Sequence, residues 1–129
     1  MAFLFEKLEV YEKALELVEE VHSATDISSQ GYGHIVSQLR RAATSIPLNI
    51  AEGFGRFNEG EKRRFYQIAR ASCYECVAAL DLCHRCRVID EDVFSSMKSR
   101  SDEVGRMLTG LIKAVERRAQ ATGSGKPQT

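Results

Sequence analysis

The side chains best suited to chemistry are four cysteines in one short segment. Cys73, Cys76, Cys83 and Cys86 give the spacing C-x2-C-x6-C-x2-C, with His84 inside the second pair, and paired C-x2-C motifs are typical of zinc sites. On a helix, which rises about 1.5 Å per residue, the outer two cysteines stand roughly 20 Å apart, whereas one zinc ion holds each sulfur at about 2.3 Å. We therefore predict reduced, metal-free cysteines packed as small apolar side chains, with a metal or redox role as the alternative.

The remaining sequence offers little for catalysis. The three histidines are His22, His34 and His84, and each falls on a different expected element without a nucleophile motif or a phosphate-binding glycine loop nearby. Carboxylate di-metal bundles need inward-facing Glu-x-x-His motifs, which we do not find. We predict that the protein is not an enzyme, binds no metal and needs no cofactor or small-molecule substrate.

Two expected helices carry cations and aromatic rings opposite their core positions. Arginine offers planar donors to phosphate, and tyrosine rings stack on unpaired bases, as in the recognition of looped or single-stranded RNA. Because Lys+Arg and Asp+Glu both number 18, giving zero net charge, an ordinary solvated surface is the alternative. On the first of these helices, Arg64 and Tyr66 flank the row of cations and aromatic rings that faces away from the core. The residues predicted to bind nucleic acid are Arg63, Arg70, Tyr74, Arg106, Lys113 and Arg117.

A second predicted surface is suited to self-association. One expected helix has an apolar stripe beside its core stripe, and another carries a leucine and polar groups on the side away from its core, which simple solvent exposure does not require. Burial of both surfaces in an oligomer accounts for them. Glu52 and Arg56 are spaced to form a helical ion pair, which is the simpler reading of those two residues. The predicted subunit-interface residues are Leu8, Tyr11, Leu15, Arg41, Leu48, Asn49 and Glu52.

These side chains require helices to position them. The chain has 129 residues, of which 43% are hydrophobic, enough for one core without disulfides or metal. Its apolar runs are far shorter than the ~20 residues that span a bilayer, and no secretory signal is apparent, so we expect a cytoplasmic protein without a membrane partner. Apolar residues recur with helical spacing in four segments. The predicted fold is all-α: an antiparallel, up-down-up-down four-helix bundle.

The helix boundaries follow from capping and turn residues. The first helix is expected from about Glu6 to Thr25, and the second starts near residues 32–34. Pro47 interrupts the second pattern, which predicts a kinked helix, or two shorter helices as the alternative. Asn58 is expected to cap the third helix and Asp90 the fourth. We predict one bundle domain over residues 1–121 and a disordered tail over 122–129, which is rich in glycine and polar residues.

The segment 37–53, SQLRRAATSIPLNIAEG, resembles the signature of the bacterial four-helix bundle protein family encoded in intervening sequences of large-subunit ribosomal RNA genes. Segments 5–14 and 65–75 also resemble family blocks, so the resemblance covers about residues 5–88. Ala71 stands where the family often has glycine. The resemblance implies a ring-like homopentamer, similar in fold to accessory proteins of diversity-generating retroelements that bind nucleic acid and a reverse transcriptase.

Two functions are therefore predicted as alternatives. The first is a non-enzymatic oligomer that binds RNA or associates with nucleoprotein through its basic and aromatic helix surfaces. The second is a protein–protein adaptor or scaffold, resembling a reverse-transcriptase accessory subunit, that does not bind RNA directly. Salt dependence separates the two, because neutralising phosphates makes the logarithm of affinity fall linearly with the logarithm of salt concentration.

Overall fold

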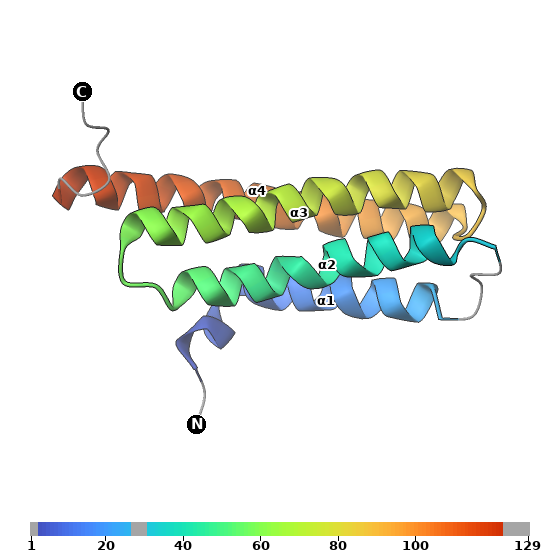
Figure 1. Cartoon of the computed structure of the whole chain (residues 1–129), viewed down its shortest axis with the longest axis horizontal. Coiled ribbons are helices and arrows are strands. Elements are labelled where there is room, and N and C mark those ends of the chain that lie inside the picture. The colour runs from blue at the N-terminus through green and yellow to red at the C-terminus, as the bar shows by residue number, and fades with distance from the viewer. Residues whose placement is uncertain (1–2, 27–30, 123–129) are drawn as a thin grey trace.

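The chain forms four long α-helices preceded by one short 3-10 helix (Figure 1). The computed structural model describes residues 3–26 and 31–122, and this part of the chain contains no strand. The predicted all-α, four-helix fold is confirmed. The predicted tail falls outside the described residues except for Thr122, which ends the last helix. The elements are η1 (Leu4–Lys7), α1 (Glu9–Ala24), α2 (Gly33–Phe54), α3 (Glu59–Arg85) and α4 (Glu91–Thr122).

The helices are arranged in a closed cycle. Each packs against its neighbours in sequence, and α4 returns to pack against α1. Connections at alternate ends of the bundle make successive helices run in opposite directions, with α1 and α2 on one side and α3 and α4 on the other (Figure 1). Side-chain pairs agree with this for the last two helices: Arg63 near the start of α3 meets Glu116 near the end of α4, and Asp81 late in α3 meets Lys98 early in α4.

Two predicted caps hold helix N-termini in place. The Asn58 side chain accepts a hydrogen bond from the Glu61 backbone amide at 3.1 Å, and Asp90 does the same for Val93 at 2.9 Å. These contacts satisfy amide groups that have no partner inside the helix. At the end of α2, the Lys62 ammonium donates to the Phe54 carbonyl at 2.8 Å. A cation at this position also interacts favourably with the helix dipole.

The start of the first helix differs from its predicted position. Periodicity placed it near Glu6, but α1 begins at Glu9, and the preceding residues form the separate 3-10 helix. The Phe3 backbone amide donates to the Glu6 carboxylate at 2.8 Å, and Leu8 adopts an extended conformation at the junction. The bond to Glu6 caps the start of η1, and the extended Leu8 separates this short helix from α1. Apolar spacing does not detect a break of one residue, which is why it misplaced the boundary.

The second helix continues through its proline. A single helix runs from Gly33 to Phe54 with Pro47 inside it and buried, so the alternative of two shorter helices is wrong. The predicted kink stays a prediction. Proline removes one backbone donor and crowds the preceding turn. In this bundle the apolar packing of the neighbouring Ile46 and Ile50, both fully buried, favours an uninterrupted helix.

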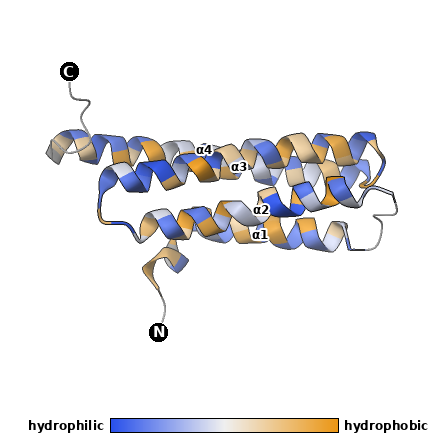
Figure 2. Cartoon of the chain, viewed as in Figure 1, coloured by the Kyte–Doolittle hydropathy of each residue, from blue (hydrophilic) through white to orange (hydrophobic). Residues whose placement is uncertain are grey.

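The core is built from one apolar stripe on each helix, with polar residues alternating around the outer surface (Figure 2). Helical spacing predicts Phe65 as the first core residue of α3, but Phe65 is half-buried, and the neighbouring Tyr66 is almost wholly buried. Gly53 makes this possible, because a Cβ there would stand 2.8 Å from Cε1 of Tyr66. The ring therefore occupies space that any other residue at position 53 would fill.

Candidate nucleic-acid and subunit interfaces

All six residues predicted to bind nucleic acid lie on α3 and α4, which pack side by side. We call them together the α3–α4 face: Arg63, Arg70, Tyr74, Arg106, Lys113 and Arg117. Five of them are exposed and Arg70 is half-buried. Tyr66, predicted at the margin of this stripe, turns into the core instead. Tertiary packing has therefore gathered five cations and one exposed aromatic ring on one side of the bundle.

Several of these cations have partners on α4. Arg63 forms an ion pair with Glu116 at 3.0 Å, and Arg106 pairs with Asp102 at 2.7 Å with side chains 77% and 63% exposed. The Arg70 guanidinium donates to the Thr109 hydroxyl at 3.3 Å. Exposed ion pairs contribute little stability, about 0–1 kcal/mol. A phosphate group can therefore replace either carboxylate at small cost.

Lys113 and Arg117 are the unpaired part of the α3–α4 face. Both are exposed, and within residues 3–26 and 31–122 neither forms an ion pair. They are spaced four residues apart on α4, so they lie on the same side of the helix. Their charge is available to an external anion without breaking any existing contact.

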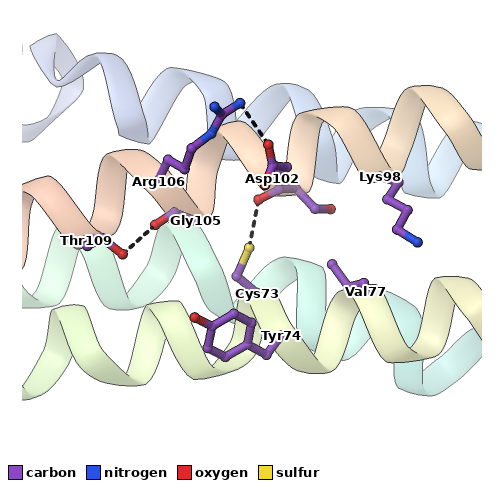
Figure 3. A pocket seen from close by; sticks show the side chains of 9 residues that line it. Cys73, Tyr74, Val77, Lys98, Asp102, Gly105, Arg106 and Thr109 are labelled. Carbon is purple, nitrogen blue, oxygen red and sulfur yellow. Dashed lines mark hydrogen bonds and ion pairs between the residues drawn. The ribbon is translucent and has the colours of Figure 1, made fainter.

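A groove of about 350 Å³ opens between α3 and α4 within this face (Figure 3). Tyr74 and Val77 border it on α3, and Gly105 and Arg106 on α4. Gly105 has no side chain to fill the space, and a Cβ there would meet only Cys73 Sγ, at 3.6 Å. The other lining residues are Cys73, Lys98, Ser101, Asp102 and Thr109.

Cys73 forms part of the groove floor and was placed wrongly by the sequence. Helical spacing puts Cys73 and Cys86 at the two edges of the buried stripe of this helix, but Cys73 is only 2% exposed, and its thiol donates to the Ser101 carbonyl at 3.1 Å. Burial raises the pKa of Cys73 to about 11 and that of Cys76 to about 12. Both thiols are therefore protonated at neutral pH and unreactive as nucleophiles.

The other two cysteines lie nearer the end of α3. Cys83 is buried, Cys86 is half-buried, and all four are free thiols. They lie along α3 and the first residue after it, in the helical arrangement that argues against a shared metal ion. Among the residues that the structure describes, no group of three or more His, Cys, Asp or Glu side chains is placed to hold a metal.

The predicted subunit-interface residues all lie on α1, α2 and the residue before α1, whereas the α3–α4 face lies on the other two long helices. Leu48 is 65% exposed, and Arg41 is also exposed. A shallow depression surrounds Leu48, bordered by Arg41, Thr44 and Asn49. An exposed leucine in a polar-rimmed depression is typical of protein contact surfaces.

The polar members of this surface are partly satisfied inside the chain. Asn49 donates to the Ser45 hydroxyl at 2.9 Å, and Ser45 shares a hydrogen bond of 2.8 Å with Ser72 on α3. Glu52 pairs with Arg56 at 2.6 Å, as the helical ion-pair reading of these residues predicted. Leu48 and Arg41 are therefore the members of the set that remain most available to a partner.

The α1 members are less exposed than the sequence suggested. Leu8 and Tyr11 pack against the core, and the Phe5 ring of η1 contacts Tyr11 edge-on with centroids 5.0 Å apart. Leu15 is half-buried. The chain itself thus covers part of the second apolar stripe, because η1 folds back beside α1 and α2.

The match to a family model decides the relationship of this chain to known proteins. The model of the 23S rRNA-intervening sequence protein matches residues 6–110. The chain belongs to this family. The family match covers α1, α2, α3 and the α4 residues of the groove, and it ends before Lys113 and Arg117.

One solved structure supports the fold. A protein of unknown function from the S23 ribosomal protein family of Bacteroides thetaiotaomicron is 24% identical and superposes with a TM-score of 0.75. The similarity covers 81% of this chain and 98% of that chain. No curated protein sequence matches significantly. Within the described residues, no helix has the length and apolar character needed to cross a membrane.

Sequence reasoning missed the groove itself. Its α4 side is made by Ser101, Gly105 and Thr109, three small residues at four-residue intervals that lie along one side of the helix. This spacing was visible in the sequence. What was not visible is that Tyr74 and Val77 of α3 border the same space, because that depends on how the two helices are aligned.

Proposed function

We propose that the protein is a non-enzymatic homo-oligomer that binds single-stranded or looped RNA through the α3–α4 face. Assembly occurs through the other two long helices, around Leu48 on α2 and the half-buried apolar residues of α1. Residues of the α3–α4 face recur in each subunit of the assembly. The pentameric ring implied by the resemblance to the family is the expected form.

The observation that carries this proposal is the separation of the two surfaces. Every candidate RNA-binding residue is on α3 or α4, and every candidate interface residue is on or beside α1 and α2. In the proposed assembly, Leu48 is buried and the α3–α4 face stays open. A ring of identical subunits needs two different contact surfaces on each subunit, and the Leu8–Leu15 stripe and the α2 outer surface supply two.

Electrostatics and multiplicity support RNA as the ligand. The α3–α4 face has five cations, with Asp102 and Glu116 as their carboxylate partners, so it is locally positive although the chain is neutral. A single subunit offers too few cations for tight binding. Repeated copies in one assembly raise the overall affinity by about 10²–10⁴ when a strand reaches more than one copy. The family description ties its members to intervening sequences of 23S rRNA, which agrees with an RNA partner.

Adjacent arginines provide the sharpest test. Arg63 belongs to the α3–α4 face, whereas the neighbouring Arg64 lies over the Phe65 ring, 5.0 Å from its centroid. Arg63→Glu should weaken RNA binding and reduce the salt slope, and the double variant Arg63→Glu with Arg70→Glu should do so more strongly. Arg64→Glu has the same charge change and should have a smaller effect. Light scattering verifies assembly before each titration.

An adaptor function is the second candidate, favoured by the pairing of Arg63 and Arg106 with carboxylates. In that case the cations keep the surface soluble, and Leu48 or the groove contacts another protein. The double variant Arg63→Glu with Arg70→Glu then still forms the oligomer, and its RNA affinity and the dependence of that affinity on salt are unchanged. That result rejects the RNA-binding proposal.

A further inference from the structure

The floor of the α3–α4 groove is apolar in character although several of its atoms are polar. The Cys73 thiol donates to the Ser101 carbonyl, the Ser101 hydroxyl donates to the Met97 carbonyl, and the Thr109 hydroxyl donates to the Gly105 carbonyl. The donor hydrogens of all three side chains are thus used inside the protein. A ligand in the groove gains chiefly from apolar contact, because these donors are not free to bind it.

Tyr74 gives the groove an aromatic border. Its ring is 67% exposed, and among the described residues it makes no hydrogen bond or ring contact. Figure 3 shows the ring on the α3 side of the groove, across from Gly105 and Arg106 of α4. A flat aromatic ligand can therefore stack on Tyr74 and extend over Gly105, where no side chain blocks it.

Two cations of α4 line the groove. They are Lys98 and Arg106, separated by roughly 12 Å along α4, given about 1.5 Å per residue. Arg106 is paired with the exposed carboxylate of Asp102 at 2.7 Å. Lys98 lies 3.8 Å from the exposed carboxylate of Asp81 and 5.1 Å from the centroid of the Phe94 ring. Anionic groups on either side of a bound ring can compete for these cations, because exposed pairs are weak.

The geometry points to a nucleobase site: one unstacked base of single-stranded RNA lies in the α3–α4 groove against Tyr74 and over Gly105, with its flanking phosphates near Lys98 and Arg106. This inference rests on the proposed function and adds to it a specific place for a base. The volume of the groove, about 350 Å³, accommodates a single base. Stacking on tyrosine tolerates any base, so weak sequence preference is expected.

Two glycines on α4 make a matched pair of variants. Gly105 borders the groove, whereas a Cβ on Gly110 meets no atom within 4 Å. Gly105→Leu should fill the groove, and Gly110→Leu makes the same change outside it. Tyr74→Ala removes the stacking ring, and Tyr74→Phe retains it. Because Tyr74 is exposed, its variants report on binding even if Gly105→Leu fails to fold.

The measurement is fluorescence anisotropy with a short labelled single-stranded RNA and a matched strand whose bases are replaced by abasic ribose. Gly105→Leu and Tyr74→Ala should weaken binding of the ordinary strand by roughly 5- to 150-fold, the range for loss of one base–aromatic stack. Gly110→Leu and Tyr74→Phe should remain within about twofold of the original protein. The abasic strand should bind the original protein weakly and should be insensitive to Gly105→Leu.

The outcomes separate this inference from the function on which it rests. The base site is wrong if Gly105→Leu and Tyr74→Ala bind the ordinary strand as tightly as the original protein does, and if the abasic strand binds as tightly as the ordinary strand. RNA binding itself still stands in that case, provided that Arg63→Glu with Arg70→Glu weakens it. Equal affinity for duplex and single-stranded RNA also overturns the base site. If no RNA binds the assembled protein at any salt concentration, both proposals are wrong.

Discussion

The two sides of this bundle differ in how their polar groups are used. On the α3–α4 face, charged groups point outward and meet in exposed pairs such as Arg106–Asp102, which an external anion can exchange. On α2, Asn49 and Ser45 are instead tied to each other and to Ser72 of α3, and Leu48 remains exposed. One side is thus suited to electrostatic, salt-sensitive contacts, and the other to apolar contact that depends little on salt.

The largest expected effect comes from placing charge on the apolar side. Leu48→Asp should shift the mass measured by light scattering from several times 14.4 kDa towards the monomer while helical circular dichroism is retained. RNA affinity should fall by about 10²–10⁴, because avidity is lost. Leu15→Asp should act in the same direction. Leu82→Asp, at an exposed leucine on α3, is the control. A monomeric original protein contradicts the assembly.

The next effect concerns the unpaired cations of the opposite side. Lys113→Glu with Arg117→Glu should weaken RNA binding without altering the mass of the assembly. The slope of log affinity against log salt should fall by about 0.7 for each lost phosphate contact on a single strand. These residues need not exchange an existing partner, so each should contribute at least as much as Arg106. If the slope for this variant is unchanged, Lys113 and Arg117 do not contact RNA phosphates.

A smaller effect is expected where α2 meets α3, the junction that keeps the two sides in fixed relation. Gly53→Ala should lower the free energy of unfolding by about 1–3 kcal/mol, the usual cost of overpacking, because the buried Tyr66 ring stands 2.8 Å from the new Cβ. Gly110→Ala has open space and should leave stability unchanged or raise it by up to about 1 kcal/mol. Urea unfolding of both variants measures the difference.

The smallest effect distinguishes the core from the groove floor. Cys76→Ser should destabilise by about 1–3 kcal/mol, because its hydroxyl is imperfectly satisfied in the core. Cys73→Ser should cost less, since a hydroxyl there can still donate to the Ser101 carbonyl that the thiol now contacts. If urea unfolding shows that Cys73→Ser and Cys76→Ser lose the same free energy of unfolding, the serine at position 73 does not keep this hydrogen bond.

The same thiols make stability depend on alkaline pH. Burial raises the pKa of Cys73 to about 11 and that of Cys76 to about 12, from 9.0. Their contribution is complete below pH 9 and is lost as pH rises through the folded-state pKa values, because the unfolded chain releases its protons first. Urea midpoints measured from pH 7 upward should fall above about pH 9, and less steeply in Cys76→Ala.

The sequence by itself determined the local features of this protein. Helical spacing predicted the four helices, and the short polar side chains of Asn58 and Asp90 marked two N-termini because they bond amides only three residues away. The separation of the two candidate surfaces onto different helices was also present in the sequence. Helices and their N-caps depend on residues that are close together in the chain, so residue type and spacing are enough to predict them.

Tertiary structure alone decided which side chains meet between helices. The burial of Tyr66 instead of Phe65 depends on the space beside Gly53 of another helix, and the pairing of Arg63 with Glu116 depends on how α3 and α4 are aligned. The groove exists because Tyr74 of α3 lies across from Gly105 of α4. Periodicity fixes which side of a helix is buried, but a small rotation or shift between packed helices changes every such contact.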